Sequence, residues 1–363
     1  MALSPGFWRR RRVLVTGHSG FKGGWLCWWL HALGARVAGI ALDPPSEPCL
    51  AGVTGLEREI SAERCDVRDA GALRAAVARH QPEIVFHLAA QSLVRRSYAM
   101  PVDTFATNIA GTVNCLQAVL ECSSVRAAIM VTSDKCYRDD GQGRAFVESD
   151  PLGGHDPYAA SKACAEIVTA SYRDALFLPR GAALVASARA GNVLGGGDWA
   201  EDRLVPDALA AFVAGQPMVL RNPRATRPWQ HVLEALHGYL ILGERLHGGD
   251  RGAAAAWNFG PDQADVRPVS WIAEGLARRW GAGAGWRQAE GAQVHETVDL
   301  GLDSSQARAR LGWRPLLGLE QALDWIVEWH RAYLSGSTGD GVARGARAAT
   351  LAQIDRYQTR CLA

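Results

Sequence analysis

The 363-residue sequence lacks several features that would place it in a specialised class of protein. It has no run of about 18 consecutive apolar residues, the length that a membrane-spanning helix needs, so we expect no membrane partner. The segment before the basic run 9–12 has no apolar stretch, and we therefore expect no secretory leader. The formal net charge is only +2, which argues against nucleic acid as the main partner.

Cysteine is present but is not arranged for disulfide bonds or for metal ligation. The eight cysteines are scattered along the chain and form no C-x-x-C pair. Free, mostly buried thiols in a reducing compartment explain this spacing better than disulfide bonds or zinc, so we expect a cytoplasmic protein without a metal site. The hydrophobic share of 48% and the charged share of 21% are ordinary for a globular protein.

A glycine-rich stretch near the N-terminus has the form of a dinucleotide-binding turn. The apolar run 13–15 leads into Gly17, Gly20 and Gly23, and an apolar run of helical length follows. Glycine lets the backbone turn sharply and approach a phosphate, and the helix that begins there directs free N–H groups at an anion. An acidic residue about 20 positions later should hold a ribose hydroxyl, and Asp43 follows Gly23 at that distance. An Asp rather than an Arg at this place favours NAD over NADP.

Segments that are typical of strands and of helices alternate over the first half of the chain. This alternation predicts an α/β fold with a doubly wound parallel sheet of the Rossmann type. We expect residues 1–190 to form the NAD-binding domain, with the catalytic residues. Residues 191–335 should form a smaller C-terminal substrate-binding lobe, partly interleaved with the first domain. Residues 336–363 should be a loose tail or a short helix.

Polar or small residues follow several of the expected strands, at the edge of the sheet where ligands of doubly wound proteins bind. Asp66 should lie where it could recognise the adenine base of the cofactor, although a capping or loop role for Asp66 is equally consistent with the sequence. Small side chains after the strand that ends near His87 would let a cofactor lie over the strand ends. The residues that we expect to contact NAD are Gly17, His18, Gly20, Phe21, Lys22, Gly23, Asp43, Asp66, Val67, Leu88, Ala89, Ala90, Asn108, Tyr158 and Lys162.

Tyr158 and Lys162 lie four residues apart in a segment that is predicted to be a helix, so they share one of its faces. A free tyrosine is a poor base, but a neighbouring ammonium group and a positive nicotinamide ring favour the phenolate. With Ser133 at the end of the preceding strand, this set could take a proton from a sugar or alcohol hydroxyl while hydride leaves its carbon. On spacing alone, a Tyr–Lys pair on the surface is the more common explanation.

The combination of these motifs resembles the extended short-chain dehydrogenase/reductase family. The glycine motif, the strand end 87–91, Ser133 and the Tyr158-x-x-x-Lys162 pair occur in the order that is typical of that family. Within it, the chain is similar to the nucleotide-sugar 4,6-dehydratases, above all to those that use CDP-glucose. The stretches that carry this similarity are 18–25, 133–135, 190–193, 196–199 and 227–232.

The resemblance implies a chemistry for Asp134 and Lys135. Removing water between C5 and C6 of a hexose needs oxidation at C4, a base for the C5 proton, an acid for the C6 hydroxyl and return of hydride to C6. The resemblance assigns the acid to Asp134, which requires a raised pKa. It assigns the base to Lys135, whose pKa burial near Lys162 would lower, at a place where dTDP-sugar dehydratases carry Glu. An exposed Asp134–Lys135 ion pair is the competing explanation.

The resemblance also implies a nucleotide-sugar substrate, with Gln91, Asn192, Arg203 and Arg227 as candidate binding residues. Guanidinium groups suit phosphate oxygens, and Arg227 lies within a matching stretch, whereas Arg203 could be a solvated loop residue. The implied activity is the NAD-dependent conversion of CDP-glucose to CDP-4-dehydro-6-deoxyglucose. A nucleotide-sugar 4-epimerase, a dehydratase for a GDP- or dTDP-hexose and a non-catalytic NAD-sensing protein are the alternatives. By analogy of fold, helices near 101–121 and 157–175 are candidate faces of a homodimer or homotetramer.

Overall fold

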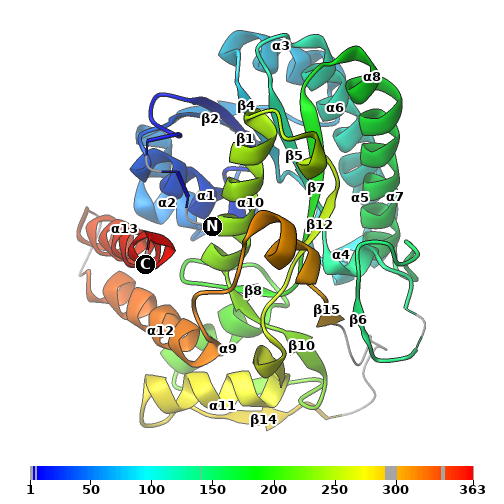
Figure 1. Ribbon diagram of the computed structural model, residues 1–363. Helices are drawn as coiled ribbons and strands as arrows, with labels where there is room; N and C mark the ends of the chain where they lie inside the picture. Colours follow the sequence, from blue (N-terminus) through cyan, green and yellow to red (C-terminus); the bar gives the residue numbers. More distant parts are fainter. Residues whose placement is uncertain (1–2, 5, 140, 291–300, 337–339, 363) are drawn as a thin grey trace.

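A seven-stranded parallel sheet forms the centre of the computed structural model, which describes residues 3–4, 6–139, 141–290, 301–336 and 340–362. The strand order is β12-β7-β5-β4-β1-β2-β3, and every neighbouring pair is parallel (Figure 1). These strands are β1 (Arg12–Thr16), β2 (Arg36–Ala41), β3 (Ser61–Arg64), β4 (Ile84–His87), β5 (Ala127–Val131), β7 (Leu184–Ala190) and β12 (Ala256–Phe259).

Helices cover both faces of this sheet, because the side chains of each buried strand alternate between two apolar cores. Val13 and Val15 of β1 point into one core and Leu14 into the other. The doubly wound fold that the alternation of segments predicts is therefore confirmed. The helices on the first face are α1 (Phe21–Ala32) and α10 (Val232–His247), and those on the second are α3 (Ala70–His80), α6 (Gly111–Glu121) and α7 (Pro157–Tyr172).

Helix α1 is buried on nearly all sides and holds the glycine turn against the rest of the molecule. Trp25, Trp28 and Trp29 are fully buried. The indole of Trp25 donates to the Gly196 carbonyl over 2.9 Å, and the indole of Trp28 donates to the Thr54 hydroxyl over 2.8 Å. The three buried aromatic side chains, two of them with hydrogen-bonded N–H groups, give α1 a fixed position, which in turn fixes the loop that precedes it.

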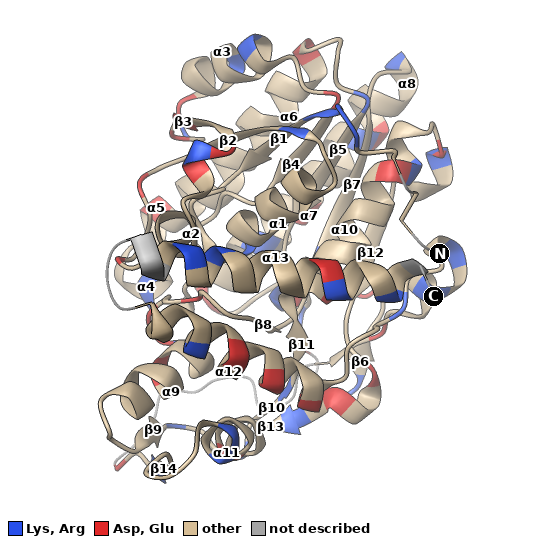
Figure 2. Ribbon diagram, turned by 90° about the vertical axis from the view of Figure 1, so that its left-hand side faces the viewer, with Lys and Arg blue, Asp and Glu red and all other residues tan. Residues whose placement is uncertain are grey.

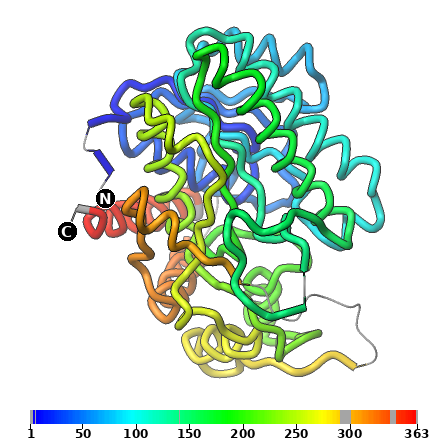
Figure 3. The backbone as a smooth tube through the Cα atoms, turned by 45° about the vertical axis from the view of Figure 1, so that its right-hand side comes forward, coloured from blue at the N-terminus to red at the C-terminus, as the bar shows by residue number. Residues whose placement is uncertain are grey.

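Most residues beyond β7 build a smaller lobe outside the carboxyl ends of the strands, at the bottom of Figures 1 and 3. The chain returns from this lobe to the sheet in α10 and β12. The helices of the lobe are α9 (Leu204–Val213), α11 (Val269–Trp280) and α12 (Leu319–Ser335). Its short strands are β8 (Val193–Leu194), β9 (Met218–Leu220), β10 (Thr226–Pro228), β11 (Gln230–His231), β13 (Val266–Pro268) and β14 (Trp286–Gln288).

The remaining elements are short, apart from the C-terminal helix. They are α2 (Leu50–Thr54), α4 (Val94–Ala99), α5 (Pro101–Phe105), α8 (Leu178–Arg180) and the pair β6 (Ala145–Phe146) and β15 (Gly301–Leu302). None of the helices in the described ranges has both the length and the apolar content that crossing a bilayer requires.

The C-terminal segment is a long helix, α13 (Asp340–Leu362), where the sequence suggested a loose tail or a short helix. It packs against α12, α2 and α1 and crosses between α12 and the sheet layer in Figure 2. Tyr357 is fully buried and donates its hydroxyl to Glu234 of α10 over 2.7 Å. Small and polar residues such as Ala346 and Thr350 form much of its buried face, so the segment has no apolar stripe that would predict the helix.

Candidate active site

A cavity of about 900 Å³ lies at the carboxyl ends of the sheet strands and is closed on its other side by the smaller lobe. The structure brings nearly all the sequence-predicted residues together in its wall. Those that line the cavity are Gly17, Gly20, Phe21, Lys22, Gly23, Asp43, Asp66, Val67, Leu88, Ala89, Ala90, Gln91, Ser133, Asp134, Lys135, Tyr158, Lys162, Asn192, Arg203 and Arg227.

The glycine turn is so tightly packed that side chains at Gly17 and Gly23 would collide with neighbouring backbone atoms. Gly17 has a φ of +80°, and a Cβ on it would lie 2.9 Å from the Ala89 nitrogen. A Cβ on Gly23 would lie 2.1 Å from the Gly17 carbonyl oxygen. Helix α1 begins after Gly20 with no side-chain cap and no acidic residue in its first turn, so its positive end is available to an anion.

The two carboxylates at the far end of the cavity are each paired with an arginine. Asp43 is 89% exposed and accepts from Nε of Arg64 over 2.7 Å. Asp66 accepts from Nη2 of Arg68 over 2.6 Å, and hydrogen bonds from Arg68 lower the pKa of Asp66. Both carboxylates line the cavity, where their oxygens can accept from hydroxyl or amino groups of a ligand.

Two predicted cofactor residues do not line the cavity. The ring of His18 is buried against Gly39, where a Cβ would lie 2.5 Å from its Cγ atom. Asn108 donates to the Gln91 carbonyl and accepts from the Gln91 nitrogen, both over 2.9 Å, so it holds the backbone of the loop that follows β4. His18 packs beneath the turn and Asn108 positions a loop, so neither side chain lines the cavity, and a contact of these residues with the cofactor stays a prediction.

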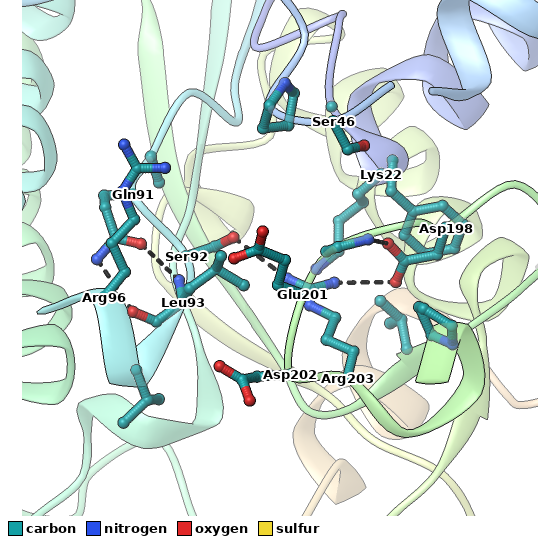
Figure 4. A pocket seen from close by; sticks show the side chains of 18 of the residues that line it. Lys22, Ser46, Gln91, Ser92, Leu93, Arg96, Asp198, Glu201, Asp202 and Arg203 are labelled. Atoms are coloured by element: carbon teal, nitrogen blue, oxygen red, sulfur yellow. Dashed lines mark hydrogen bonds and ion pairs between the residues drawn. The ribbon is translucent and has the colours of Figure 1, made fainter. Parts of the chain in front are cut away.

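The Gln91 side chain also has partners of its own in this structure. Its amide donates to the Leu93 carbonyl over 3.0 Å and to the Thr104 hydroxyl over 2.9 Å, and its oxygen accepts from the Leu93 nitrogen over 2.6 Å (Figure 4). Gln91 therefore shapes the cavity wall through the loop that it closes.

Tyr158 and Lys162 project from the start of α7, which begins where the sequence places it. The Asp156 carboxylate caps the helix by accepting from the Ala159 nitrogen over 2.9 Å. Tyr158 and Lys162 are both buried, and Lys162 donates through Nζ to the Val131 carbonyl over 3.2 Å. This contact joins the helix to the end of β5, directly before the segment that carries Ser133.

Burial dominates the protonation of this pair. It raises the pKa of Tyr158 to about 12, and although the hydrogen bond with Ser133 opposes this rise, the Asp134 charge adds to it. Burial lowers the pKa of Lys162 to about 8, while the nearby Glu166 carboxylate opposes this fall. The groups that oppose the rise in the pKa of Tyr158 are the Ser133 hydroxyl and the charged Arg203. The lowering expected from Lys162 stays a prediction, and a further positive charge in the cavity would favour the phenolate.

Asp134 has the environment that a general acid requires. Its carboxyl is buried, and Oδ1 accepts from the Ser133 hydroxyl over 2.9 Å. Among the described residues, Oδ2 has no hydrogen-bond partner. Burial raises the pKa of Asp134. Lys135 lines the same cavity but is only half-buried. The two residues face a ligand site and not bulk solvent, so the simple surface ion pair does not describe them.

A third lysine, Lys22, reaches this centre from the glycine turn. The Nζ atom of Lys22 lies 3.4 Å from the Tyr239 hydroxyl. Burial lowers the pKa of Lys22 to about 7, and the positive charges of Arg203 and Lys162 lower it further. The sequence places Lys22 in the cofactor motif but does not show that its side chain extends to the catalytic end of the cavity.

A buried ion pair supports the catalytic residues from behind and was not among the predicted site residues. Glu166 of α7 accepts from the guanidinium of Arg189 over 2.7 Å and from the Ser187 hydroxyl over 2.6 Å. It also accepts from the Thr132 hydroxyl, next to Ser133. Glu166 continues the four-residue spacing of Tyr158 and Lys162, and this spacing is the signal that could have identified it.

The candidate substrate residues lie on the opposite wall, in the smaller lobe. Arg227 is buried and donates to the Thr226 carbonyl over 2.7 Å. The backbone carbonyl of Asn192 accepts a hydrogen bond from the backbone nitrogen of Gln230 over 3.1 Å. Asn192 lines the cavity. Arg203 also lines the cavity, and its guanidinium lies 3.3 Å from the Asp198 carboxylate.

Comparison with known proteins agrees with this geometry. Residues 13–260 match the model of the NAD dependent epimerase/dehydratase family. The chain is 44% identical over 339 residues to the CDP-glucose 4,6-dehydratase of Salmonella typhimurium strain LT2, which covers 92% of this chain and 94% of the relative. It is 27% identical over 348 residues to the dTDP-glucose 4,6-dehydratase of Xanthomonas campestris pv. campestris, over 90% of this chain and 93% of the relative.

Solved structures share the fold at low sequence identity. The UDP-glucose 4-epimerase of Thermotoga maritima, solved with UDP-glucose, superposes with a TM-score of 0.76 at 21% identity, over 89% of this chain and 99% of that one. The dTDP-glucose 4,6-dehydratase of Bacillus anthracis, solved in complex with NAD, superposes with a TM-score of 0.72 at 20% identity, over 88% and 96% of the two chains.

Proposed function

The chain belongs to the NAD-dependent epimerase/dehydratase family, and from this premise we propose that it dehydrates CDP-glucose to CDP-4-dehydro-6-deoxyglucose. The observation that carries the proposal is Asp134. A buried carboxyl with a raised pKa and one free oxygen beside Ser133 and Tyr158 suits a group that protonates a leaving hydroxyl. An epimerase has no leaving hydroxyl and needs no such acid.

The first chemical task is removal of the proton from the C4 hydroxyl. Tyr158 is the base, Ser133 holds the hydroxyl, and Lys162 supplies positive charge from the next turn of α7. Bound NAD supplies the acceptor and later the donor of hydride, together with a positively charged ring that favours the phenolate. The glycine turn and Asp43 would hold its phosphates and its ribose.

The second task is loss of water across C5 and C6. The ketone at C4 acidifies the C5 proton, which Lys135 takes as base. Asp134 delivers a proton to the C6 hydroxyl, which leaves as water. Burial raises the pKa of Asp134, which favours the protonated form, and its free Oδ2 is the atom that is available to the substrate.

Two alternatives use the same scaffold. UDP-glucose 4-epimerases occur among the relatives, including that of Mycolicibacterium smegmatis at 28% identity over 326 residues, which covers 88% of this chain and 98% of the relative. A dehydratase for a dTDP- or GDP-hexose differs in the nucleoside diphosphate sugar that it accepts. CDP-glucose is favoured because the CDP-glucose relative is far more similar in sequence than the dTDP-glucose relatives.

One experiment separates these activities. The protein is incubated with NAD and with CDP-, dTDP-, GDP- and UDP-glucose in turn, each labelled with deuterium at C4, and the products are analysed by mass spectrometry and NMR. The proposal expects a 4-ketosugar from CDP-glucose with the label on the C6 methyl group. Return of the label to C4 would instead show an epimerase. Absence of turnover with every sugar would favour a non-catalytic NAD-sensing protein.

A homodimer is the assembly that the exposed apolar residues support. Tyr98, Val102 and Phe105 of the α4–α5 region are 58%, 79% and 37% exposed, and Ile167 of α7 is 56% exposed. Helices α5 and α7 pack against each other, so these residues lie on adjoining helices (Figure 1). Such a group on a soluble chain is typical of a protein interface. Val102→Asp should lower the mass that light scattering measures, whereas an unchanged mass would rule this face out.

A further inference from the structure

The loop that joins β8 to α9 crosses the mouth of the cavity and touches the opposite wall. Its residues 198–203, which we call the strap, face residues 91–96 in Figure 4. The Arg203 guanidinium donates to the Ser92 hydroxyl over 3.2 Å. Asp202 lies 3.3 Å from the guanidinium of Arg95 on α4. The strap therefore links the smaller lobe to the sheet side of the cavity through charged groups.

Asp202 also binds an arginine from its own lobe. Its Oδ1 atom lies 2.7 Å from Nη1 of Arg221, which follows β9 and lines the cavity. One carboxylate oxygen thus pairs with two guanidinium groups that come from opposite walls. The backbone of Asp202 has a φ of +59°, a left-handed conformation that Asp and Asn tolerate better than other non-glycine residues.

The two ion pairs that Asp202 makes are exposed enough for a ligand to take the place of its carboxylate. The side chains of Asp202, Arg95 and Arg221 are 39%, 46% and 29% exposed. Ion pairs with that much water access contribute little to stability, because solvent screens them. A diphosphate carries more charge than a carboxylate and offers several oxygens to a guanidinium fork, so it is the stronger partner for Arg221.

We propose that Asp202 is a positioning residue that occupies the place of the substrate's diphosphate on Arg221 when the cavity holds no nucleotide sugar. This inference rests on the proposed function, because it takes the ligand to be a nucleoside diphosphate sugar. When the diphosphate binds Arg221, the Asp202 carboxylate is displaced, and the bond from the strap to Arg95 is lost with it. The Asp202 carboxylate thereby lowers the affinity for substrate. Binding of the substrate also breaks the ion pair that joins the strap to Arg95 across the mouth of the cavity.

The strap itself provides a matched control. Glu201 precedes Asp202, is exposed, and has no ion pair among the described residues. Glu201→Gln removes the same formal charge from the same loop, so it measures the general attraction between the cavity and an anionic ligand. Asp202→Asn removes the charge that is paired, and asparagine tolerates the left-handed backbone.

The test measures binding by isothermal titration calorimetry with CDP and with CDP-glucose, in low and high salt. Asp202→Asn should lower both dissociation constants by about 3-fold to 5-fold relative to Glu201→Gln, the range expected when an exposed ion pair no longer competes. Arg221→Gln should raise both constants, and the double variant should show no gain from Asp202→Asn. Equal constants for Asp202→Asn and Glu201→Gln, or a gain that persists without Arg221, would overturn the proposal.

Calorimetry keeps this inference separate from the proposed reaction. If CDP binds more tightly to Asp202→Asn but CDP-glucose is not dehydrated, the role of Asp202 stands and the proposed activity fails. If the wild-type protein dehydrates CDP-glucose and the constants of Asp202→Asn match those of Glu201→Gln, the activity stands and the role of Asp202 fails.

Discussion

Two ion pairs, one behind the sheet side of the cavity and one on its lobe side, are held in opposite ways. On the sheet side, Glu166 and Arg189 are 2% and 4% exposed and share hydrogen bonds with neighbouring hydroxyl groups. On the lobe side, Asp202 and Arg221 pair at 39% and 29% exposure. Breaking a buried pair leaves an uncompensated charge in a medium of low dielectric constant, whereas water readily solvates the members of an exposed pair.

This difference matches the tasks of the two walls. The sheet side must keep a tyrosine, a serine and a lysine within a narrow geometry during proton transfer, and a network that is costly to break does so. The lobe side must exchange one anion for another each time a substrate enters and a product leaves. Weak, half-exposed pairs allow that exchange at little cost. The following predictions test this comparison with substitutions, from the largest expected effect to the smallest.

Tyr158→Phe should abolish oxidation at C4, because no group remains to take the hydroxyl proton. The expected loss in kcat is about 10²-fold to 10⁴-fold, the range of a general base. Rapid mixing with CDP-glucose should show no appearance of reduced nicotinamide absorbance, while calorimetry should show NAD binding unchanged. Substantial turnover by this variant would refute the assignment of the base.

Glu166→Gln should destabilise the protein, because Arg189 would be left charged and unpaired in the interior. Removing one partner of a buried pair costs about 3–5 kcal/mol in the free energy of unfolding. Urea denaturation measures this change. Loss of the Glu166 charge should also lower the pKa of Lys162, since that carboxylate raises it, and so move the pH profile of C4 oxidation to lower pH. Glu166→Asp should restore the profile in part, and a variant as stable as the wild type would contradict the role of the buried pair.

Lys135→Ala should allow oxidation but block loss of water, because no base takes the C5 proton. We expect kcat to fall by about 10²-fold or more, with reduced nicotinamide accumulating on the enzyme in a single turnover. Asp134→Asn is the companion variant and should stop at the same stage. Normal dehydration by Lys135→Ala would exclude that lysine as the base.

Glu234→Gln should have an intermediate effect on stability, and this effect should depend on pH. Glu234 is a buried carboxyl whose partners are hydrogen-bond donors. Burial raises its pKa from 4.5 to about 7. The folded state therefore binds this proton more tightly than the unfolded state, so the contribution to stability is largest at low pH. It is lost progressively as the pH rises from about 4.5 to about 7. Thermal melts over this range should show that loss in the wild type and a flatter curve in Glu234→Gln.

Arg95→Gln should have the smallest effect on folding, because it removes only an exposed partner of Asp202. The expected change in the free energy of unfolding is within about 0.5 kcal/mol. Urea denaturation beside Glu166→Gln provides the direct comparison of the two walls. A loss as large as that of Glu166→Gln would show that the pair between the strap and α4 is held as rigidly as the buried Glu166–Arg189 pair.

Local periodicity and motif spacing predicted the parts of the molecule in which neighbours along the chain are also neighbours in space. The glycine turn, α1, the buried strands and the Tyr158–Lys162 face depend on contacts within a few residues or on the pleat of a strand, so the sequence alone indicates them. The strand ends converge because all strands of the sheet are parallel, which is why Ser133 and Gly17 could be placed in one cavity before the structure was seen.

Contacts between distant segments were decided only by the tertiary structure. His18 and Asn108 lie in the right motifs, yet packing against Gly39 and hydrogen bonds to Gln91 keep their side chains out of the cavity. Helix α13 is stabilised by its neighbours and not by an apolar stripe of its own. Asp202 pairs with Arg95, which lies 107 positions away in the sequence. No local pattern encodes such a pair, because its energy depends on the burial and separation that the assembled fold creates.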